Sequence, residues 1–98
     1  MTTYPYATRV TSDSTAVIVA QSVAGEVAVE FLVRNTHATL SIFVGAANVL
    51  TSTGYEIRAG EALSLTLGYG HNSGVASQVL YTISASAVTV DVIARLAQ

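Results

Sequence analysis

The chain has 98 residues, no cysteine and only 10% charged residues, and its formal net charge at pH 7 is −2. The absence of cysteine excludes a disulfide scaffold and any zinc or redox site built from thiolates. The four cations are all arginines and form no basic run, so the sequence offers no cationic surface of the kind that neutralises nucleic-acid phosphates.

The N-terminal residues 1–6 are predicted to form an extended arm that precedes a single β-sandwich domain at residues 7–98. Pro5 biases Tyr4 towards an extended conformation and does not favour the start of a helix. The aromatic side chains of this arm could lie on the domain as part of a loose terminus. Alternatively, Tyr4, Pro5 and Tyr6 could contact a neighbouring protein, because exposed tyrosine is enriched at interfaces.

Neither export nor membrane insertion is expected. The first ten residues lack the charged and apolar segments of a signal peptide. The most apolar window, residues 16–33, contains Gln and Glu and alternates with period two, so it does not predict a transmembrane helix.

Runs of alternating apolar and polar side chains predict about eight short strands. They are expected at residues 7–11, 15–22, 27–34, 40–44, 55–58, 61–67, 79–85 and 88–96. In the second of these both faces are largely apolar, which predicts a strand covered on both sides. No window shows a capped helical stripe. The fold class is therefore all-β, a single antiparallel β-sandwich or jelly-roll-like barrel with no significant helix.

Residues 40–67 are expected to organise the fold. Gly45, Gly54 and Gly60 punctuate this stretch and are predicted to form turns, because glycine adopts the positive φ angles that tight turns need. Valine at Gly54 or Gly60 is expected to cost stability and assembly rather than a specific activity.

The two histidines do not predict a catalytic or metal site. His37 and His71 each stand alone on a polar loop, whereas a metal site needs further ligands nearby. A triad of Ser73, His71 and either Asp13 or Asp91 would lack the strained turn that presents a nucleophile. Both histidines are expected to be exposed loop residues.

The charged residues Glu56, Arg58 and Glu61 flank a predicted turn. Paired carboxylates can perform acid–base chemistry, but alternating charges on an edge turn are typical of a solvated ion cluster. We therefore expect no catalytic residue, no metal, no cofactor and no enzymatic activity.

The segment 68–74, GYGHNSG, has the glycines of a phosphate-binding loop but lacks its lysine and a following helix. A loop tip is the simpler interpretation. If this loop has a function, Tyr69 and His71 are the candidates for contact with a partner or a glycan.

The composition favours assembly over a free monomer. Hydrophobic residues make up 51% of the chain, and the low charge content matches the centres of protein interfaces, which are depleted of Lys, Glu and Asp.

A succession of structural motifs extends over residues 33–94. A first strand ends with Val33-Arg34-Asn35, and a second strand reaches Gly45. The segment Val49-Leu50-Thr51 then leads to Gly54-Tyr55, and the turn Ala59-Gly60-Glu61 leads into a Leu-rich strand. Two more strands follow at residues 80–83 and 88–93. This succession resembles the small β-sandwich virion structural proteins of tailed bacteriophages, of the capsid decoration or head-fibre type. Residues 1–26 do not match the pattern.

The resemblance implies a non-enzymatic structural protein of the virion, foremost a capsid decoration (cementing) protein that binds the assembled shell and stabilises it. It implies synthesis in the host cytoplasm, a place in the virion, and the major capsid protein or another virion protein as partner. It also implies a homo-oligomer, commonly a trimer. Two alternatives stay open: a carbohydrate- or receptor-binding module of a tail or fibre, with the Tyr69 loop as its site, and a self-associating β-domain without a shell partner.

Overall fold

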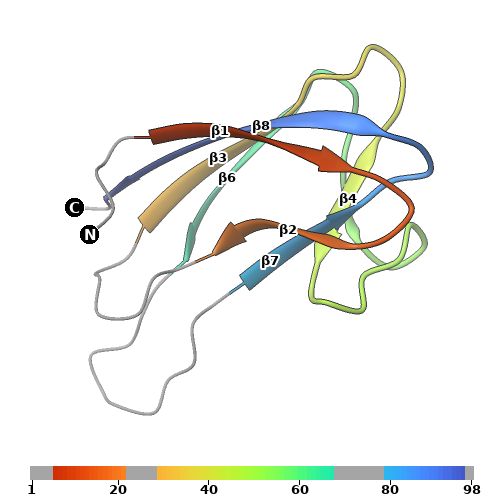
Figure 1. Ribbon diagram of the computed structural model, residues 1–98, viewed down its shortest axis with the longest axis horizontal. Helices are drawn as coiled ribbons and strands as arrows, with labels where there is room; N and C mark the ends of the chain where they lie inside the picture. Colours follow the sequence, from red (N-terminus) through yellow and green to blue (C-terminus); the bar gives the residue numbers. More distant parts are fainter. Residues whose placement is uncertain (1–5, 22–28, 68–78, 97–98) are drawn as a thin grey trace.

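The computed structural model describes residues 6–21, 29–67 and 79–96, which form eight strands (Figure 1). The strands are β1 (Tyr6–Ser12), β2 (Val17–Gln21), β3 (Val29–Asn35), β4 (Ile42–Gly45), β5 (Tyr55–Ile57), β6 (Ala62–Leu67), β7 (Val79–Ile83) and β8 (Val88–Leu96). These ranges contain no helix, and so none that could span a membrane. The predicted all-β class is confirmed.

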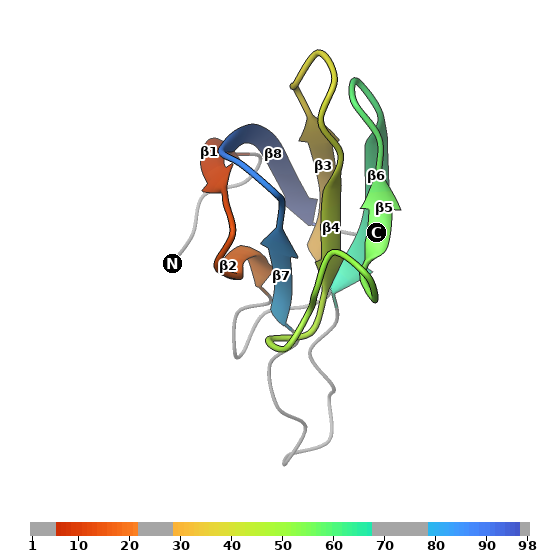
Figure 2. The same ribbon diagram turned by 90° about the vertical axis from the view of Figure 1, so that its right-hand side faces the viewer.

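The strands form two four-stranded antiparallel sheets, with orders β1-β8-β3-β6 and β2-β7-β4-β5. The sheets lie face to face, so that β6 and β5 occupy the same side of the sandwich and β1 and β2 the opposite side (Figures 1 and 2). The first and last strands pair with each other. The predicted β-sandwich is therefore confirmed.

The hydrophobic core lies between the sheets and is built by alternate residues of the strands. Its most deeply buried side chains include Val29, Phe31, Val33, Ile42, Ile57, Val88, Val90 and Val92. Burying a side chain of this size stabilises the fold by about 1.5–3 kcal/mol, before chain entropy is counted. Alternation in β3 and β8 thus follows the sequence pattern directly.

The expectation that the second strand is covered on both faces is wrong. Ile18 is 44% exposed on the outer surface of its sheet, while Val19 and Ala20 are both buried. A bulge between Ile18 and Ala20 interrupts the pairing of β2 with β7. Because a bulge adds a residue to one strand, the alternation changes phase there, and the successive residues Val19 and Ala20 both point inwards.

Of the predicted N-terminal arm, the structure describes only Tyr6. Tyr6, its last residue, begins β1 and is paired with Ala94 of β8. Residues 1–5, including Tyr4 and Pro5, lie outside the described residues.

Candidate functional site

His37, predicted to be an exposed loop residue, is instead half-buried and braces its own loop. Its ring Nδ1 accepts hydrogen bonds from the backbone N–H groups of Thr39 (3.0 Å) and Leu40 (2.9 Å). These two backbone N–H groups thereby gain a hydrogen-bond partner, so His37 has a structural role in the loop. Tyr69, His71 and Ser73 lie outside the described residues. Within the described ranges, no group of three or more His, Asp or Glu residues could hold a metal ion.

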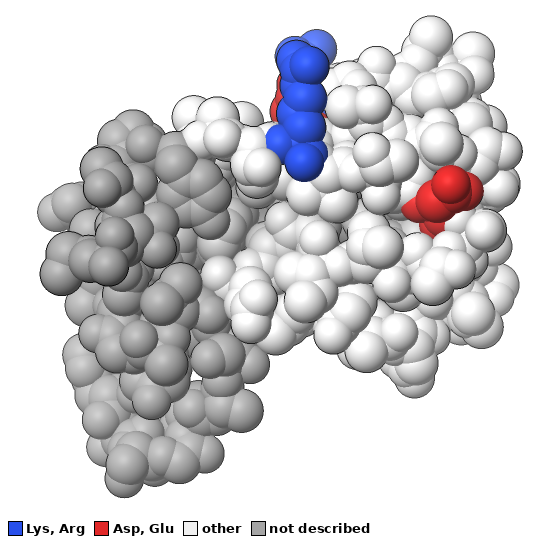
Figure 3. Space-filling view, in the orientation of Figure 1, with Lys and Arg blue, Asp and Glu red and all other residues white. Residues whose placement is uncertain are grey.

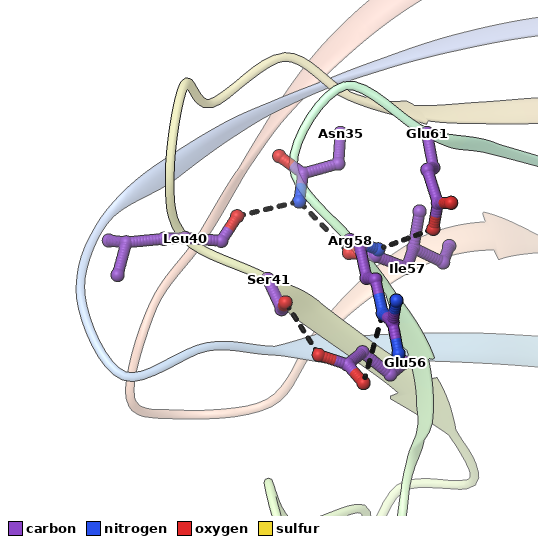
Figure 4. A network of polar contacts seen from close by, with 7 residues as sticks. All are labelled: Asn35, Leu40, Ser41, Glu56, Ile57, Arg58 and Glu61. Carbon is purple, nitrogen blue, oxygen red and sulfur yellow. Dashed lines mark hydrogen bonds and ion pairs between the residues drawn. The ribbon is translucent and has the colours of Figure 1, made fainter.

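Asn35, at the end of β3, is fully buried and joins two connections of the fold (Figure 4). Its Nδ2 donates to the carbonyls of Leu40 (2.8 Å) and Ile57 (2.9 Å), and its Oδ1 accepts from the backbone N–H of His37 (2.9 Å). A buried carboxamide with three partners is a structural brace, because each lost bond would leave a buried group unpaired. Sequence reasoning noted this asparagine only as a strand end.

The predicted ion cluster at Glu56, Arg58 and Glu61 forms in part. Arg58 Nε lies 3.9 Å from Glu56 Oε1 on the exposed surface. Glu56 also accepts from the hydroxyl of Ser41 (2.7 Å), and Glu61 Oε1 accepts from the backbone N–H of Arg58 (3.2 Å; Figure 4). Glu61 therefore braces the β5–β6 connection, whereas Glu56 ties β5 to the segment that leads into β4.

The three predicted turn glycines differ in kind. Gly60 has φ of 78°, as expected for a glycine turn, and an added Cβ would meet nothing within 4 Å. Gly45 and Gly54 do not have positive φ, so the expectation of positive φ is wrong for them. Their constraint is steric: a Cβ on Gly54 would lie 2.7 Å from Val49 Cγ2, and one on Gly45 would lie 3.1 Å from the same atom.

Buried hydroxyl groups link the two sheets where β1 approaches β7. Ser12 Oγ lies 3.2 Å from Thr82 Oγ1 and 3.0 Å from Ser84 Oγ. The Ser84 hydroxyl also lies 2.8 Å from the carbonyl of Ser86, to which it can donate. These groups satisfy one another, which explains why polar side chains are tolerated inside the sandwich.

An apolar row crosses the exposed side of the β1-β8-β3-β6 sheet, which we call the outer face. Leu32 of β3 and Ile93 of β8 stand directly opposite each other and are 42% and 46% exposed. Ala7 of β1 and Ser64 of β6 extend the row to the two edges of the sheet. Large exposed apolar residues that are adjacent in space are more informative than isolated ones, because they form a patch.

Charged residues flank this row on both sides. On one side Asp91 stands between Arg9 and Arg34, and Arg9 Nε donates to Asp91 Oδ1 (2.9 Å). On the other side Arg95 pairs with Glu30 across the strands. Three arginines oppose two carboxylates, so this face carries a net positive charge although the whole chain is negative.

Two open hollows lie beside the Leu32–Ile93 pair. One, of about 360 Å³, extends towards Arg9 and Arg34, and the other, of about 310 Å³, extends towards Glu30 and Arg95. An apolar centre bordered by polar, partly paired charges is the anatomy of a protein–protein interface. In the view of Figure 3, charged atoms occupy only small, separate areas of the described surface.

Comparisons with protein-family models, with curated proteins and with solved structures find no match. The resemblance to phage virion proteins therefore stays a prediction.

Proposed function

We propose that the protein is a non-enzymatic structural component of a tailed-phage virion, which docks by its outer face on the assembled capsid shell and stabilises it. The observation that supports this proposal is the exposed Leu32–Ile93 pair, set in a row of small side chains between two charged rows. An open sheet face with this pattern suits a protein surface better than a small molecule, because it offers apolar contact without an enclosed cavity.

The proposed partner is the major capsid protein or another virion protein. Contact with Leu32 and Ile93 would remove apolar surface from water. This burial would stabilise the complex by about 25 cal/mol per Å². The net positive charge of the outer face favours a partner surface that carries carboxylates, since complementary charge steers docking and fixes orientation. Many copies bound to one shell would each link neighbouring subunits, and the shell would be reinforced at every such site.

The test is co-sedimentation with capsid shells of the phage whose genome carries the gene. Ile93→Asp places a charge at the centre of the outer face, whereas Ile18→Asp places one on the opposite sheet. Both isoleucines lie on strands and are similarly exposed, 46% and 44%, so they form a matched pair. We expect Ile93→Asp to weaken shell binding by about thirtyfold, corresponding to roughly 2 kcal/mol at an interface centre.

Wild type and Ile18→Asp should saturate the shells equally. If the wild type does not sediment with shells, or if both variants bind alike, docking by the outer face is wrong. A thermal melt of each variant separates a docking defect from unfolding.

A further inference from the structure

Among the described strands, four lie at the edges of the two sheets, and three of these carry features that discourage pairing with another chain. An exposed edge presents unpaired backbone groups, which proteins protect with charges, bulges or short strands. β1 carries Arg9 at its middle, β2 carries the bulge between Ile18 and Ala20, and β5 has only three residues, one of them Glu56. These edges are protected in the usual ways.

The fourth edge, β6, has none of these features. Its six residues, ALSLTL, include no charge and no proline, and its register with β3 is continuous from Ala62 to Leu67. It is the outermost strand of the β1-β8-β3-β6 sheet. The side chains of Ala62, Ser64 and Thr66 are exposed, and no strand of the described ranges covers them. β6 is thus an uncharged, regular and open edge.

The backbone groups that face this open edge can be identified from the ladder. In an antiparallel pair, residues alternate between those bonded to the neighbouring strand and those whose groups point away from it. The N–H of Asn35 donates to the carbonyl of Glu61 (2.9 Å), and these two residues continue the β3–β6 register. Since every second residue after Glu61 is again in a bonded position, the backbone groups of the three leucines of β6 bond to β3. The N–H and C=O groups of Ala62, Ser64 and Thr66 therefore point outwards.

The sequence of β6 is complementary to itself under a two-fold axis. When two copies run antiparallel with Ser64 opposite Ser64, Ala62 of each stands opposite Thr66 of the other. Every outward backbone group of these residues then meets a partner. Leu63 meets Leu65 of the second copy; both are half-buried and already pack against the core, so pairing would complete their burial.

No like charges oppose each other in this register. Glu61, the nearest charged residue, would stand opposite Leu67 of the second copy rather than its own counterpart. A β1–β1 pair would instead bring together two edges that carry Arg9.

We propose that β6 pairs antiparallel with β6 of a second copy of this chain, with Ser64 on the two-fold axis, and so forms one continuous eight-stranded sheet. Such a contact is isologous and closes at a dimer, which differs from the trimer that the phage resemblance implies. Because the axis is perpendicular to the sheet, both outer faces lie on the same side. The proposal does not depend on shell docking.

The first test is the molar mass measured by light scattering after size exclusion, from about 1 μM to about 1 mM, since small interfaces are often weak. We expect a dimer for the wild type and a monomer for Ser64→Lys, which places two ammonium groups opposite each other. The matched control is Thr11→Lys, an exposed position on the same face at the opposite edge. This control should remain a dimer, and far-UV circular dichroism should show all three folded.

A wild type that is monomeric throughout, trimeric or of open-ended size overturns the proposal. The proposal is also wrong if Ser64→Lys leaves the oligomer intact, or if Thr11→Lys dissociates it to the same extent as Ser64→Lys.

The second test uses the absence of native cysteine, which makes a single introduced cysteine unambiguous. In the proposed register the Ser64 Cα atoms are about 5.5 Å apart, within disulfide range, whereas the Thr66 Cα atoms are separated by about 13 Å along the strands. Ser64→Cys should form a disulfide-linked dimer on mild oxidation, and Thr66→Cys should not. Equal cross-linking, or none by Ser64→Cys, contradicts this register even if one lysine variant fails to fold.

Discussion

Gly54 lies where the loop after β4 packs back on its own strand. A methyl group added to it would meet Val49 Cγ2 at 2.7 Å and Phe43 Cβ at 2.8 Å. Atoms cannot approach so closely, so the loop would have to move away from β4. At Gly60 there is open space, and the cost of a side chain arises only from the left-handed backbone.

These two causes predict different substitution series. We expect Gly54→Ala to lower the free energy of unfolding by about 2–3 kcal/mol, and Gly60→Ala by about 1 kcal/mol. Gly60→Asn should be nearly neutral because asparagine tolerates the left-handed region, while Gly54→Asn should be worse than Gly54→Ala. Denaturant unfolding measures all four. Equal effects of asparagine at the two sites would show that conformation, not space, limits Gly54.

The sequence predicts turns at the glycine positions, but it does not predict why a side chain at position 54 is excluded. The exclusion depends on Val49 folding back beneath the loop, a contact between side chains that no alternation pattern encodes. The same holds for Asn35, since its partners Leu40 and Ile57 belong to two other segments. A polar residue at a strand end predicts a turn, whereas its complete burial is a tertiary property.

At the scale of elements, the quality of prediction follows the regularity of each strand. β3 and β8 alternate without interruption, and their inward residues are those that the sequence indicates. In β7 the residues of both faces include apolar ones. The structure buries Thr82 of β7 and Ser84, just after the strand, because Ser12 of β1 supplies hydroxyl partners. In β2 the bulge shifts the phase. The outer face escaped prediction because it combines side chains from strands far apart in sequence.

Asn35 links β3 to the loop before β4 and to the end of β5, so its removal should loosen several elements at once. Asn35→Leu retains the volume but leaves the carbonyls of Leu40 and Ile57 and the N–H of His37 without their partner. We expect a loss of about 3–5 kcal/mol in the free energy of unfolding. Asn35→Asp should be as costly, because a carboxylate would face two carbonyl oxygens.

Chemical denaturation of these variants is compared with that of Asn48→Leu, an exposed asparagine in the loop after β4. The control should change stability by less than about 0.5 kcal/mol. A small effect of Asn35→Leu would mean that water replaces the side chain and that the brace is dispensable.

At the scale of the whole molecule, the pairing of β1 with β8 joins the first and last strands of the described ranges. The register extends from the Tyr6–Ala94 pair to the Ser12–Val88 pair. β1 also contributes Val10 to the edge of the core and Ser12 to the buried hydroxyl groups. The sheet that carries the outer face therefore depends on residues at both ends of the chain, and Arg9 of β1 forms part of that face.

N-terminal truncation separates the arm from β1. Deleting residues 1–5 removes no pair of the described ladder, so we expect cooperative unfolding with a midpoint within a few degrees of the wild type. Deleting residues 1–12 removes β1, exposes the backbone edge of β8 and leaves Thr82 without its Ser12 partner. That variant should lose cooperative unfolding or aggregate through the new edge. Calorimetry and light scattering distinguish the two deletions. A chain without residues 1–12 that unfolds cooperatively and keeps the oligomeric state of the wild type would show that β1 is an accessory strand rather than a necessary part of the sandwich.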